Sequence, residues 1–438
     1  MQKQVSVRIV STGFKHIVIQ IPNDWKSAKI SEVTKVLQSG ISRLLSSYDI
    51  GYVILTSENI QHGNFDSTNK KYWYKIDNQG VDLKKYILDD GDIILNFINS
   101  TAQMGKSCIF RKQEREWIFT TNVFRIKIDK SKLTSEFFHK LLQTKFIQKQ
   151  ILAITQPAIN QSSFSKSDLN RVVIYYPPLK EQQKIASILS NVDELIQKTE
   201  QIIEQTQRLK KGLMQRLLTK GIGHTKFKDT ELGKIPEEWK LVNLEDLSFN
   251  IMKGIFDLNP INYVKEGIPF LRISDIIDNI VNTDSTKFIS NELSKKFMSS
   301  ELHQGDLLMA KVGASAGSVE KIAQVPSSIK KCNISQNLIG IKVDHNKVNS
   351  NYLLQFLKQK NNMDKILSGS NTTTFKSIQL NILRKIKIPL PSLKEQEKIS
   401  TVSNSLNYLS LTELNQMIKF EILKKGLMQQ LLTGKIRV

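Results

Sequence analysis

The amino-acid sequence repeats itself, and this repetition limits the possible folds more than any other feature. Leu-Lys-Glu-Gln-Gln-Lys-Ile at 179–185 returns as Leu-Lys-Glu-Gln-Glu-Lys-Ile at 393–399. Lys-Lys-Gly-Leu-Met-Gln-Arg-Leu-Leu-Thr at 210–219 returns at 424–433 with nine of ten residues identical. Both pairs of segments are 214 residues apart. Agreement at one separation over long motifs indicates a tandem duplication of one unit.

The two copies have diverged unevenly. The blocks that begin at 179 and 393 are nearly identical at both ends. The blocks 21–178 and 235–392 share only scattered positions, such as the Ile-Pro-x-x-Trp with which each of them begins. One part of the unit therefore kept a common task, while the other part was free to differ.

Each conserved block predicts one long helix. Apolar residues recur there at spacings of three and four, and Gly221 and Gly434 follow where the end of a helix favours glycine. The 42 residues 179–220 would form a rod of about 60 Å, and its apolar seam requires a partner. We expect the second helix, 393–438, to be that partner in an antiparallel pair; the alternative is that each helix packs on its own domain. The residues expected to pair the helices or to face a protein partner are Ile185, Leu189, Val192, Ile196, Leu213, Leu217, Ile399, Leu406, Met417, Leu427 and Leu431.

The variable blocks predict two mixed α/β domains. Strand-like runs lie at 52–55, 93–98, 123–128 and 172–176, with counterparts at 270–273, 307–309, 338–343 and 386–388. Helical stretches are predicted at 135–152 and 351–367. We expect a first domain at 1–178, of which 1–20 is an N-terminal extension, and a second domain at 221–392, of which 221–234 is a linker.

The composition indicates the class of partner. The 63 Lys and Arg residues exceed the 41 Asp and Glu residues, and the formal charge of +22 is spread along the chain rather than gathered in a tail. Such a charge favours a polyanionic partner, usually nucleic acid; a lysine-rich solvated surface is the alternative. With only Cys108 and Cys332, neither a disulfide scaffold nor a cysteine-based zinc site is expected. Because no apolar run has the length of a membrane span, we expect a cytoplasmic protein.

The sequence lacks the motifs of common DNA-modifying chemistry. Gly-Lys-Ser at 105–107 resembles the end of a phosphate-binding loop, but Ser100 stands where that loop begins with glycine. Tyr-Pro-Pro-Leu at 176–179 lacks the Asn or Asp with which amino-methyltransferases hold the target amine, and no Gly-x-Gly-x-x-Gly loop is present. The acidic residues and lysine at 77–84 have a nuclease-like spacing that arises often by chance, and the six histidines lack metal-ligand spacing. We therefore expect no catalysis by this chain.

The repeated motifs resemble those of the specificity subunits of type I restriction–modification enzymes. The resemblance rests on Lys-Phe-Lys-Asp-Thr-Glu-Leu-Gly-Lys-Ile-Pro-Glu-Glu-Trp at 226–239 and on the doubled motifs at the two ends of the predicted helices. It covers nearly the whole chain. It implies an α+β fold in which two tandem mixed α/β target recognition domains are separated by two long helices, which pair as an antiparallel coiled coil with pseudo-twofold symmetry.

The resemblance also implies a function and partners. The chain would be a non-catalytic subunit that reads a bipartite, asymmetric target in double-stranded DNA and directs two methyltransferase subunits and the restriction subunits to it. S-adenosylmethionine, ATP and Mg would belong to those partners, and this chain would bind no cofactor. The missing motifs disfavour a self-sufficient enzyme that fuses restriction and methylation. A stand-alone DNA-binding coiled-coil protein is the remaining alternative.

Contacts to bases are expected in the loops that differ between the two copies, because the scaffold is shared. Chosen by their position in the repeat, the residues expected to bind DNA are Thr56, Lys106, Gln161, Ser163 and Lys166 in the first copy and Arg272, Lys311, Ser315, Thr373, Thr374 and Lys376 in the second. No catalytic residue and no metal ligand is expected.

Overall fold

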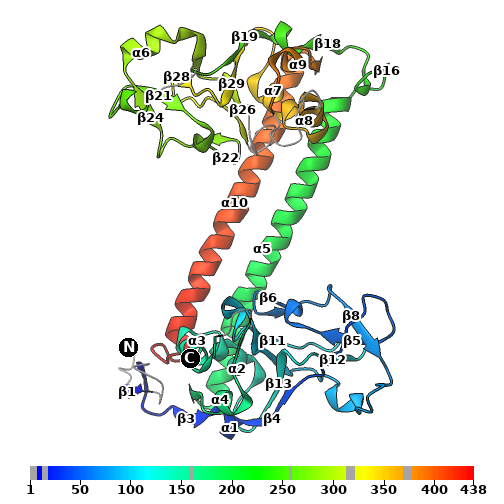
Figure 1. The fold of residues 1–438 in the computed structure, drawn as a ribbon, viewed down its shortest axis with the longest axis vertical. Coiled ribbons are helices and arrows are strands. Elements are labelled where there is room, and N and C mark those ends of the chain that lie inside the picture. Colours follow the sequence, from blue (N-terminus) through cyan, green and yellow to red (C-terminus); the bar gives the residue numbers. More distant parts are fainter. Residues whose placement is uncertain (1–6, 12–17, 158–160, 256–258, 312–320, 368–376) are drawn as a thin grey trace. The chain divides into compact units, whose positions relative to one another are not determined.

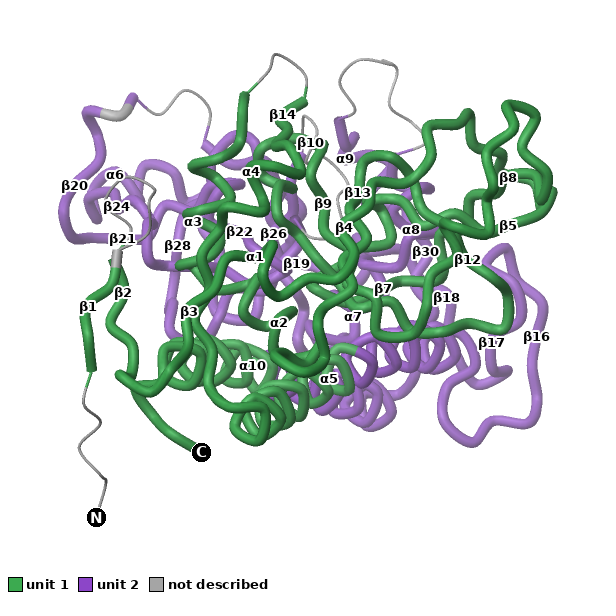
Figure 2. Tube along the Cα trace, turned by 90° about the horizontal axis from the view of Figure 1, so that it is seen from below, with its two compact units in different colours: residues 1–200, 415–438 green, residues 201–414 purple. Residues whose placement is uncertain are grey.

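The computed structural model describes residues 7–11, 18–157, 161–255, 259–311, 321–367 and 377–438. The chain forms two compact units, one made of residues 1–200 and 415–438 and the other of residues 201–414 (Figure 2). Each unit therefore contains one variable block together with part of each long helix.

The largest sheet of the first unit is four-stranded and antiparallel, in the order β11-β9-β13-β4. Its strands are β11 (Ser107–Ile109), β9 (Ile93–Asn96), β13 (Val123–Ile128) and β4 (Thr34–Ser39). A second sheet contains β12 (Trp117–Phe119), β5 (Gly51–Leu55) and β8 (Lys71–Tyr74), of which β12 and β5 are parallel. Shorter pairs are β1 (Val7–Ser11) with β2 (Val18–Pro22), β3 (Lys26–Lys29) with β15 (Val173–Tyr176), β6 (Ile60–Gln61) with β7 (Asn64–Phe65), and β10 (Ile98–Asn99) with β14 (Ser162–Ser163).

The second unit repeats this arrangement. Its four-stranded sheet consists of β19 (Ser248–Lys253), β29 (Leu338–Val343), β26 (Leu307–Ala310) and β27 (Ile322–Gln324). Its five-stranded sheet consists of β20 (Tyr263–Val264), β24 (Lys287–Ile289), β21 (Ile268–Leu271), β28 (Lys331–Ile334) and β25 (Glu301–His303), of which β21 and β28 are parallel. Two-stranded pairs are β16 (Phe227–Thr230) with β17 (Gly233–Pro236), β18 (Lys240–Asn243) with β30 (Lys387–Leu390), and β22 (Ile276–Ile277) with β23 (Ile280–Val281). The four-stranded sheets match strand for strand, so the duplication in the sequence is a duplication of fold.

The two helical stretches predicted in the variable blocks are each broken into two helices. The stretch 135–152 is divided into α2 (Ser135–Leu142) and α3 (Lys145–Ile154), and the stretch 351–367 into α7 (Ser350–Leu357) and α8 (Lys360–Leu367). In the first copy Thr144 caps a new helix, because its side chain accepts a hydrogen bond from the backbone of Ile147. The remaining short helices are α1 (Ile30–Val33), α4 (Lys166–Asn170), α6 (Asn291–Lys296) and α9 (Leu380–Arg384).

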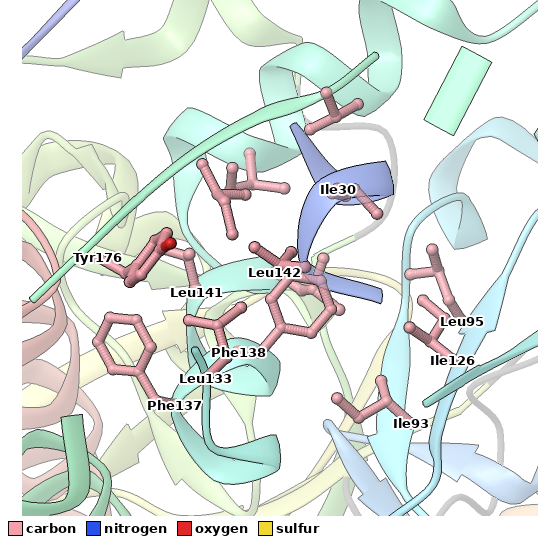
Figure 3. Packing of buried hydrophobic residues seen from close by; sticks show 14 of the residues in the cluster. Ile30, Ile93, Leu95, Ile126, Leu133, Phe137, Phe138, Leu141, Leu142 and Tyr176 are labelled. Atoms are coloured by element: carbon pink, nitrogen blue, oxygen red, sulfur yellow. The ribbon is translucent and has the colours of Figure 1, made fainter. Parts of the chain in front are cut away.

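Apolar side chains of α2 and of the four-stranded sheet form the core of the first unit. Phe137 and Phe138 of α2 are fully buried and lie in one cluster with Ile126 of β13 (Figure 3). The same cluster includes Ile185 from the first long helix and Leu431 from the second. Because burial of such a side chain contributes about 1.5–3 kcal/mol, the ends of the long helices are held firmly in the domain.

The long helices are α5 (Leu179–Lys220) and α10 (Leu393–Leu431), and each passes from one unit into the other (Figure 1). The bounds predicted for the first helix are confirmed, whereas the second helix ends earlier than residue 438. Gly221 and Gly434 follow the two helices with φ values of 65° and 69°. This left-handed conformation is the one that favours glycine after a helix, so both predicted stops are confirmed.

The two helices are antiparallel. In the first unit, Asp193 Oδ1 on α5 lies 2.6 Å from Lys424 Nζ on α10. Nearer the start of α5, Glu181 Oε1 lies 2.6 Å from Arg437 Nε, beyond the end of α10. Residue numbers therefore rise along α5 while they fall along α10, as the sequence predicted.

The glutamine of the Leu-Lys-Glu-Gln motif anchors each long helix to its domain. Gln182 is fully buried, donates to the carbonyl of Lys132 at 2.8 Å and accepts from the backbone of Thr134 at 3.0 Å. Gln396 occupies the same place in the second copy and accepts from the backbone of Asn349 at 2.7 Å. Thr134 and Asn349 cap α2 and α7, so this repeated residue joins the start of a long helix to the first turn of another helix.

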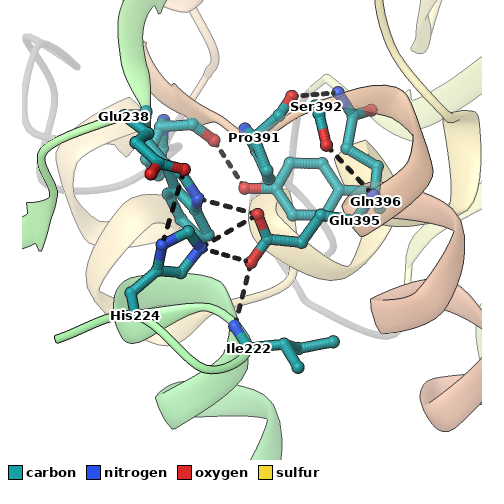
Figure 4. Close-up of polar contacts among 10 residues, drawn as sticks. Ile222, His224, Glu238, Pro391, Ser392, Glu395 and Gln396 are labelled. Carbon is teal, nitrogen blue, oxygen red and sulfur yellow. Dashed lines mark hydrogen bonds and ion pairs between the residues drawn. The ribbon is translucent and has the colours of Figure 1, made fainter.

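The glutamate of the same motif binds the segment that follows the other long helix. Glu181 binds Arg437 beyond the end of α10, and Glu395 binds the segment beyond the end of α5. Glu395 accepts hydrogen bonds from the backbone of Ile222 at 2.9 Å and from Trp239 Nε1 at 3.1 Å, and His224 Nε2 lies 2.9 Å from its Oε1 (Figure 4). Ile222 and His224 lie just beyond α5, and Glu395 is the counterpart of Glu181. The conservation of this motif between the two copies therefore has a structural cause.

Among the described residues, no helix has a stretch that is both long and apolar enough to span a membrane.

Candidate nucleic-acid interface

Each unit has one sheet that contains a parallel pair of strands, and polar residues follow both strands of that pair at one edge of the sheet. β5 and β12 are parallel, with Leu55 opposite Phe119, and β21 and β28 are parallel, with Leu271 opposite Ile334. The carboxyl ends of parallel strands meet at the same edge of a sheet. Thr56 and residues 120–122 follow the first pair, and we call them the first edge. Arg272 and residues 335–337 follow the second pair, and we call them the second edge.

A glycine lets a third segment pass close to each edge. A Cβ atom on Gly40 would lie 2.0 Å from the carbonyl oxygen of Phe119, and one on Gly254 would lie 2.1 Å from that of Ser335. No side chain fits at such distances, so only glycine allows this approach. Gly40 and Gly254 are 214 residues apart. The duplication therefore preserved the close packing behind both edges while the residues on them changed.

The first edge brings two of the predicted DNA-binding residues near one turn. Thr56 caps a short 3-10 helix by accepting from the backbone of Glu58, and the adjacent Leu55 carbonyl accepts from the backbone of Thr120 at 3.0 Å. On the other side of the turn, the Asn122 carbonyl accepts from the backbone of Ile98 at 3.3 Å. Ser163 lies opposite Ile98 in the β10–β14 pair. Thr56 and Ser163 therefore flank residues 120–122.

The second edge has the same plan with basic residues. Ser335 donates from its backbone to the Leu271 carbonyl at 2.9 Å, next to Arg272. Lys311 donates from its backbone to the Asn337 carbonyl at 2.8 Å. Arg272 and Lys311 therefore flank residues 335–337.

The two cations of the second edge differ in their electrostatic surroundings. The Arg272 guanidinium donates to Asp275 from Nε at 3.2 Å and from Nη2 at 2.9 Å, and these bonds raise the pKa of the arginine. Burial lowers the pKa of Lys311, and the charge of Lys253 lowers it further. Asp275 balances the charge of Arg272, whereas Lys311 and Lys253 repel each other, so the two lysines leave this edge positively charged. An anion such as a DNA phosphate would relieve that repulsion.

Within the described part of the chain, the other predicted DNA-binding residues make no contact with the two turns. Lys106 precedes β11, Gln161 precedes β14 and Lys166 begins α4; all three are exposed. Ser315, Thr373, Thr374 and Lys376 lie outside the described residues.

The residues predicted to pair the helices occupy two kinds of position. Ile185, Leu189 and Leu431 are buried in the core of the first unit, and Leu217 and Ile399 in the core of the second. Val192 is also buried, whereas Ile196, Leu213, Leu406, Met417 and Leu427 are half-buried along the helices. The apolar residues near the ends of the long helices thus pack on the domains, whereas those in the middle of the helices are only partly buried.

Sequence reasoning missed the turns themselves. Thr120, Thr121 and Asn122 correspond to Ser335, Gln336 and Asn337, which follow 215 residues later. A polar triplet between two predicted strands at nearly the repeat separation was a usable signal. Each triplet, however, lies beside Thr56 or Arg272 only because two strands far apart in the sequence pair in parallel. The spacing of apolar residues within one strand does not indicate such pairing.

Groups of His, Cys, Asp or Glu suited to hold a metal ion do not occur among the residues that the structure describes.

Two copies of one mixed α/β domain, which present different polar residues on a common edge and share a pair of long helices, define a duplicated recognition protein. The model of the type I restriction modification DNA specificity domain matches the chain twice, at residues 22–208 and 236–423. The chain belongs to this family. Its role is that of a DNA sequence specificity subunit of a type I restriction–modification system.

Two relatives from Methanocaldococcus jannaschii extend over almost the whole chain. The protein named as the specificity subunit of the type I restriction enzyme MjaX is 33% identical over 423 residues, which cover 96% of this chain and 95% of the relative. The specificity subunit of the type I restriction enzyme MjaVIII is 26% identical over 429 residues, with the same coverage of both chains. The family likeness therefore includes both variable blocks and both long helices.

Solved structures share the fold. The S subunit of a type I restriction–modification system from M. genitalium matches 98% of this chain and 99% of its own, with a TM-score of 0.57 and 16% identity. A chain from a structure of the assembly of the type I R-M system matches 95% of this chain and 99% of its own, with a TM-score of 0.57 and 17% identity.

Proposed function

We propose that the two domains read the two halves of a bipartite, asymmetric target in double-stranded DNA, one half at each edge. The observation that carries this proposal is the unequal divergence of the edges. Thr56 and Thr121 on the first edge correspond to Arg272 and Gln336 on the second, although the glycine behind each edge is the same. Side chains with different hydrogen-bonding groups on one scaffold would select different bases.

We propose that two methyltransferase subunits and the restriction subunits assemble on this chain. Exposed apolar side chains on the long helices support protein partners. Leu195, Ile202 and Leu209 recur every seven residues on α5 and are each more than 40% exposed. These positions differ from the residues predicted as a partner surface, several of which are buried. An apolar stripe of heptad spacing is the surface on which further helices dock.

The chemistry would reside in those partners. We propose that S-adenosylmethionine, ATP and Mg are bound there, that this chain binds none of them, and that the complex acts in the cytoplasm. The sequence supports this division because it lacks the amine-binding and nucleotide-binding motifs. The isolated chain with S-adenosylmethionine should transfer no methyl group to DNA, whereas addition of the methyltransferase subunits should produce methylation at the target. Methyl transfer by the isolated chain would contradict the proposal.

An exchange of domains tests the bipartite reading. Residues 235–392, within the predicted limits of the second domain, are replaced by the corresponding segment of a relative, and the methylated sites are mapped by sequencing. We expect one half of the target to change and the other half to remain. A change in both halves, or in neither, would contradict modular reading.

A further inference from the structure

The second edge contains a recess of about 270 Å³ that the family assignment does not explain. Its walls come from four segments: the end of β21 together with residues 272–274 that follow it, the turn 335–337, Tyr263 and Ile255. We propose that this recess receives the major-groove edge of a purine, read by Gln336 and Arg272. The inference rests on the proposed function, since it names the residues that would discriminate bases in one half of the target.

The guanidinium of Arg272 is held in place with one nitrogen unused. Nε and Nη2 donate to Asp275, and Nη2 also donates to the Ser285 carbonyl at 2.9 Å. Nη1 makes no hydrogen bond within the described part of the chain, and 28% of the side chain is exposed. An arginine fixed in this way loses little freedom when it binds, and it offers its remaining donors in one direction.

Gln336 supplies the complementary groups. Gln336 is half-buried and lines the recess, and its carboxamide has no hydrogen-bond partner among the residues that the structure describes. A carboxamide both donates and accepts. Adenine offers an N7 acceptor and an N6 donor, whereas guanine offers N7 and O6 acceptors. N7 is common to both purines and absent from pyrimidines, so a donor from Arg272 or Gln336 on N7 would select a purine.

Lysines near the recess would attract DNA without distinguishing one base sequence from another. Lys321 Nζ donates to the Ile276 carbonyl at 2.5 Å, while Lys253 and Lys311 lie close enough for their charges to interact. Lysines are typical of phosphate contacts, which strengthen binding to all sequences alike. On this surface the recess would therefore supply the selectivity, and the lysines would supply the affinity.

The test uses the full complex of this chain with its methyltransferase subunits and a set of DNA duplexes in which each position of the target is varied. For Gln336→Ala we expect discrimination to fall at one position of one half-site, by about 5- to 100-fold, with the other positions unchanged. Gln336→Glu, which keeps the size but replaces the amide donor by a carboxylate, should disfavour guanine at that same position, because N7 and O6 of guanine are both acceptors. Thermal unfolding of both variants establishes that they are folded.

Two matched variants separate this effect from others. Lys311→Ala should weaken binding to all duplexes by a similar factor. Thr121→Ala, at the corresponding place on the first edge, should affect only the other half-site. Unchanged discrimination in both folded Gln336 variants would overturn the proposal, as would an equal loss at all positions. If the unmodified complex prefers no sequence, the proposed function itself fails, which is a distinct result.

Discussion

The two copies differ in their charged residues where the long helices meet their domains. Asp193 in the first unit contacts both Lys140 and Lys424; although burial alone would raise its pKa, the two lysines lower it. The corresponding residue in the second unit is Asn407, which contacts Lys210. The second unit therefore has two half-buried lysines, Lys210 and Lys358, without the carboxylate that the first unit provides.

This difference predicts a pH-dependent stability. Burial, together with the charge of Lys210, lowers the pKa of Lys358 to about 8 from the ordinary 10.5. Between these values the unfolded chain binds more protons than the folded chain, so the free energy of unfolding should rise with pH across this interval. Asn407→Asp should raise the pKa of Lys358 and flatten that rise.

Urea unfolding at pH 8 and pH 10, with NMR titration of labelled lysine side chains, measures both effects. Lys358→Met should abolish the contribution of this lysine and serves as the control. An equal rise with pH in the original chain and in Lys358→Met would show that Lys358 is not its source.

At the scale of elements, glycines have opposite roles in the helices and behind the edges. A Cβ on Gly212 of α5 would meet no atom within 4 Å, and the same holds for Gly426 of α10. These glycines therefore do not serve a close helix approach. Gly254 is different, because its Cβ would collide with a backbone oxygen.

Alanine substitutions should consequently act in opposite directions. Gly212→Ala should stabilise the protein by about 0.5–1 kcal/mol, because alanine restricts the unfolded chain and favours helix. Gly254→Ala should destabilise it by about 1–3 kcal/mol or more, through overpacking. Denaturant unfolding followed by circular dichroism measures both, and Gly426→Ala should behave like Gly212→Ala. A neutral Gly254→Ala would mean that the segment behind the second edge can move away.

At the scale of the whole molecule, the length of the helices should set the number of base pairs between the two half-sites. Seven residues inserted into both α5 and α10 would lengthen the pair by about 10 Å while keeping the apolar spacing in phase. We expect the mapped target to keep both half-sites and to gain base pairs between them. Seven residues inserted instead at the exposed Gly80 should leave the target unchanged. Retention of the original spacing after the helix insertion would show that the helices do not set it.

The duplication, the bounds of α5, the antiparallel order of the helices and the glycine stops could all be predicted from the sequence. Each of these depends on local periodicity or on direct comparison of the copies. The helix breaks at Thr144 and near Lys358 were missed, because a capping side chain can divide an apolar pattern without altering its period.

The edges were decided by tertiary structure alone. The sequence identified Thr56, Ser163, Arg272 and Lys311 as candidates, yet it did not place them around the turns 120–122 and 335–337. Parallel strands bring together residues that are more than 60 positions apart, and side-chain patterns within one strand do not specify that pairing. The sequence by itself therefore determined what kind of protein this is, whereas only the fold decided which polar residues share a surface, because long-range pairing depends on the packing of the whole domain.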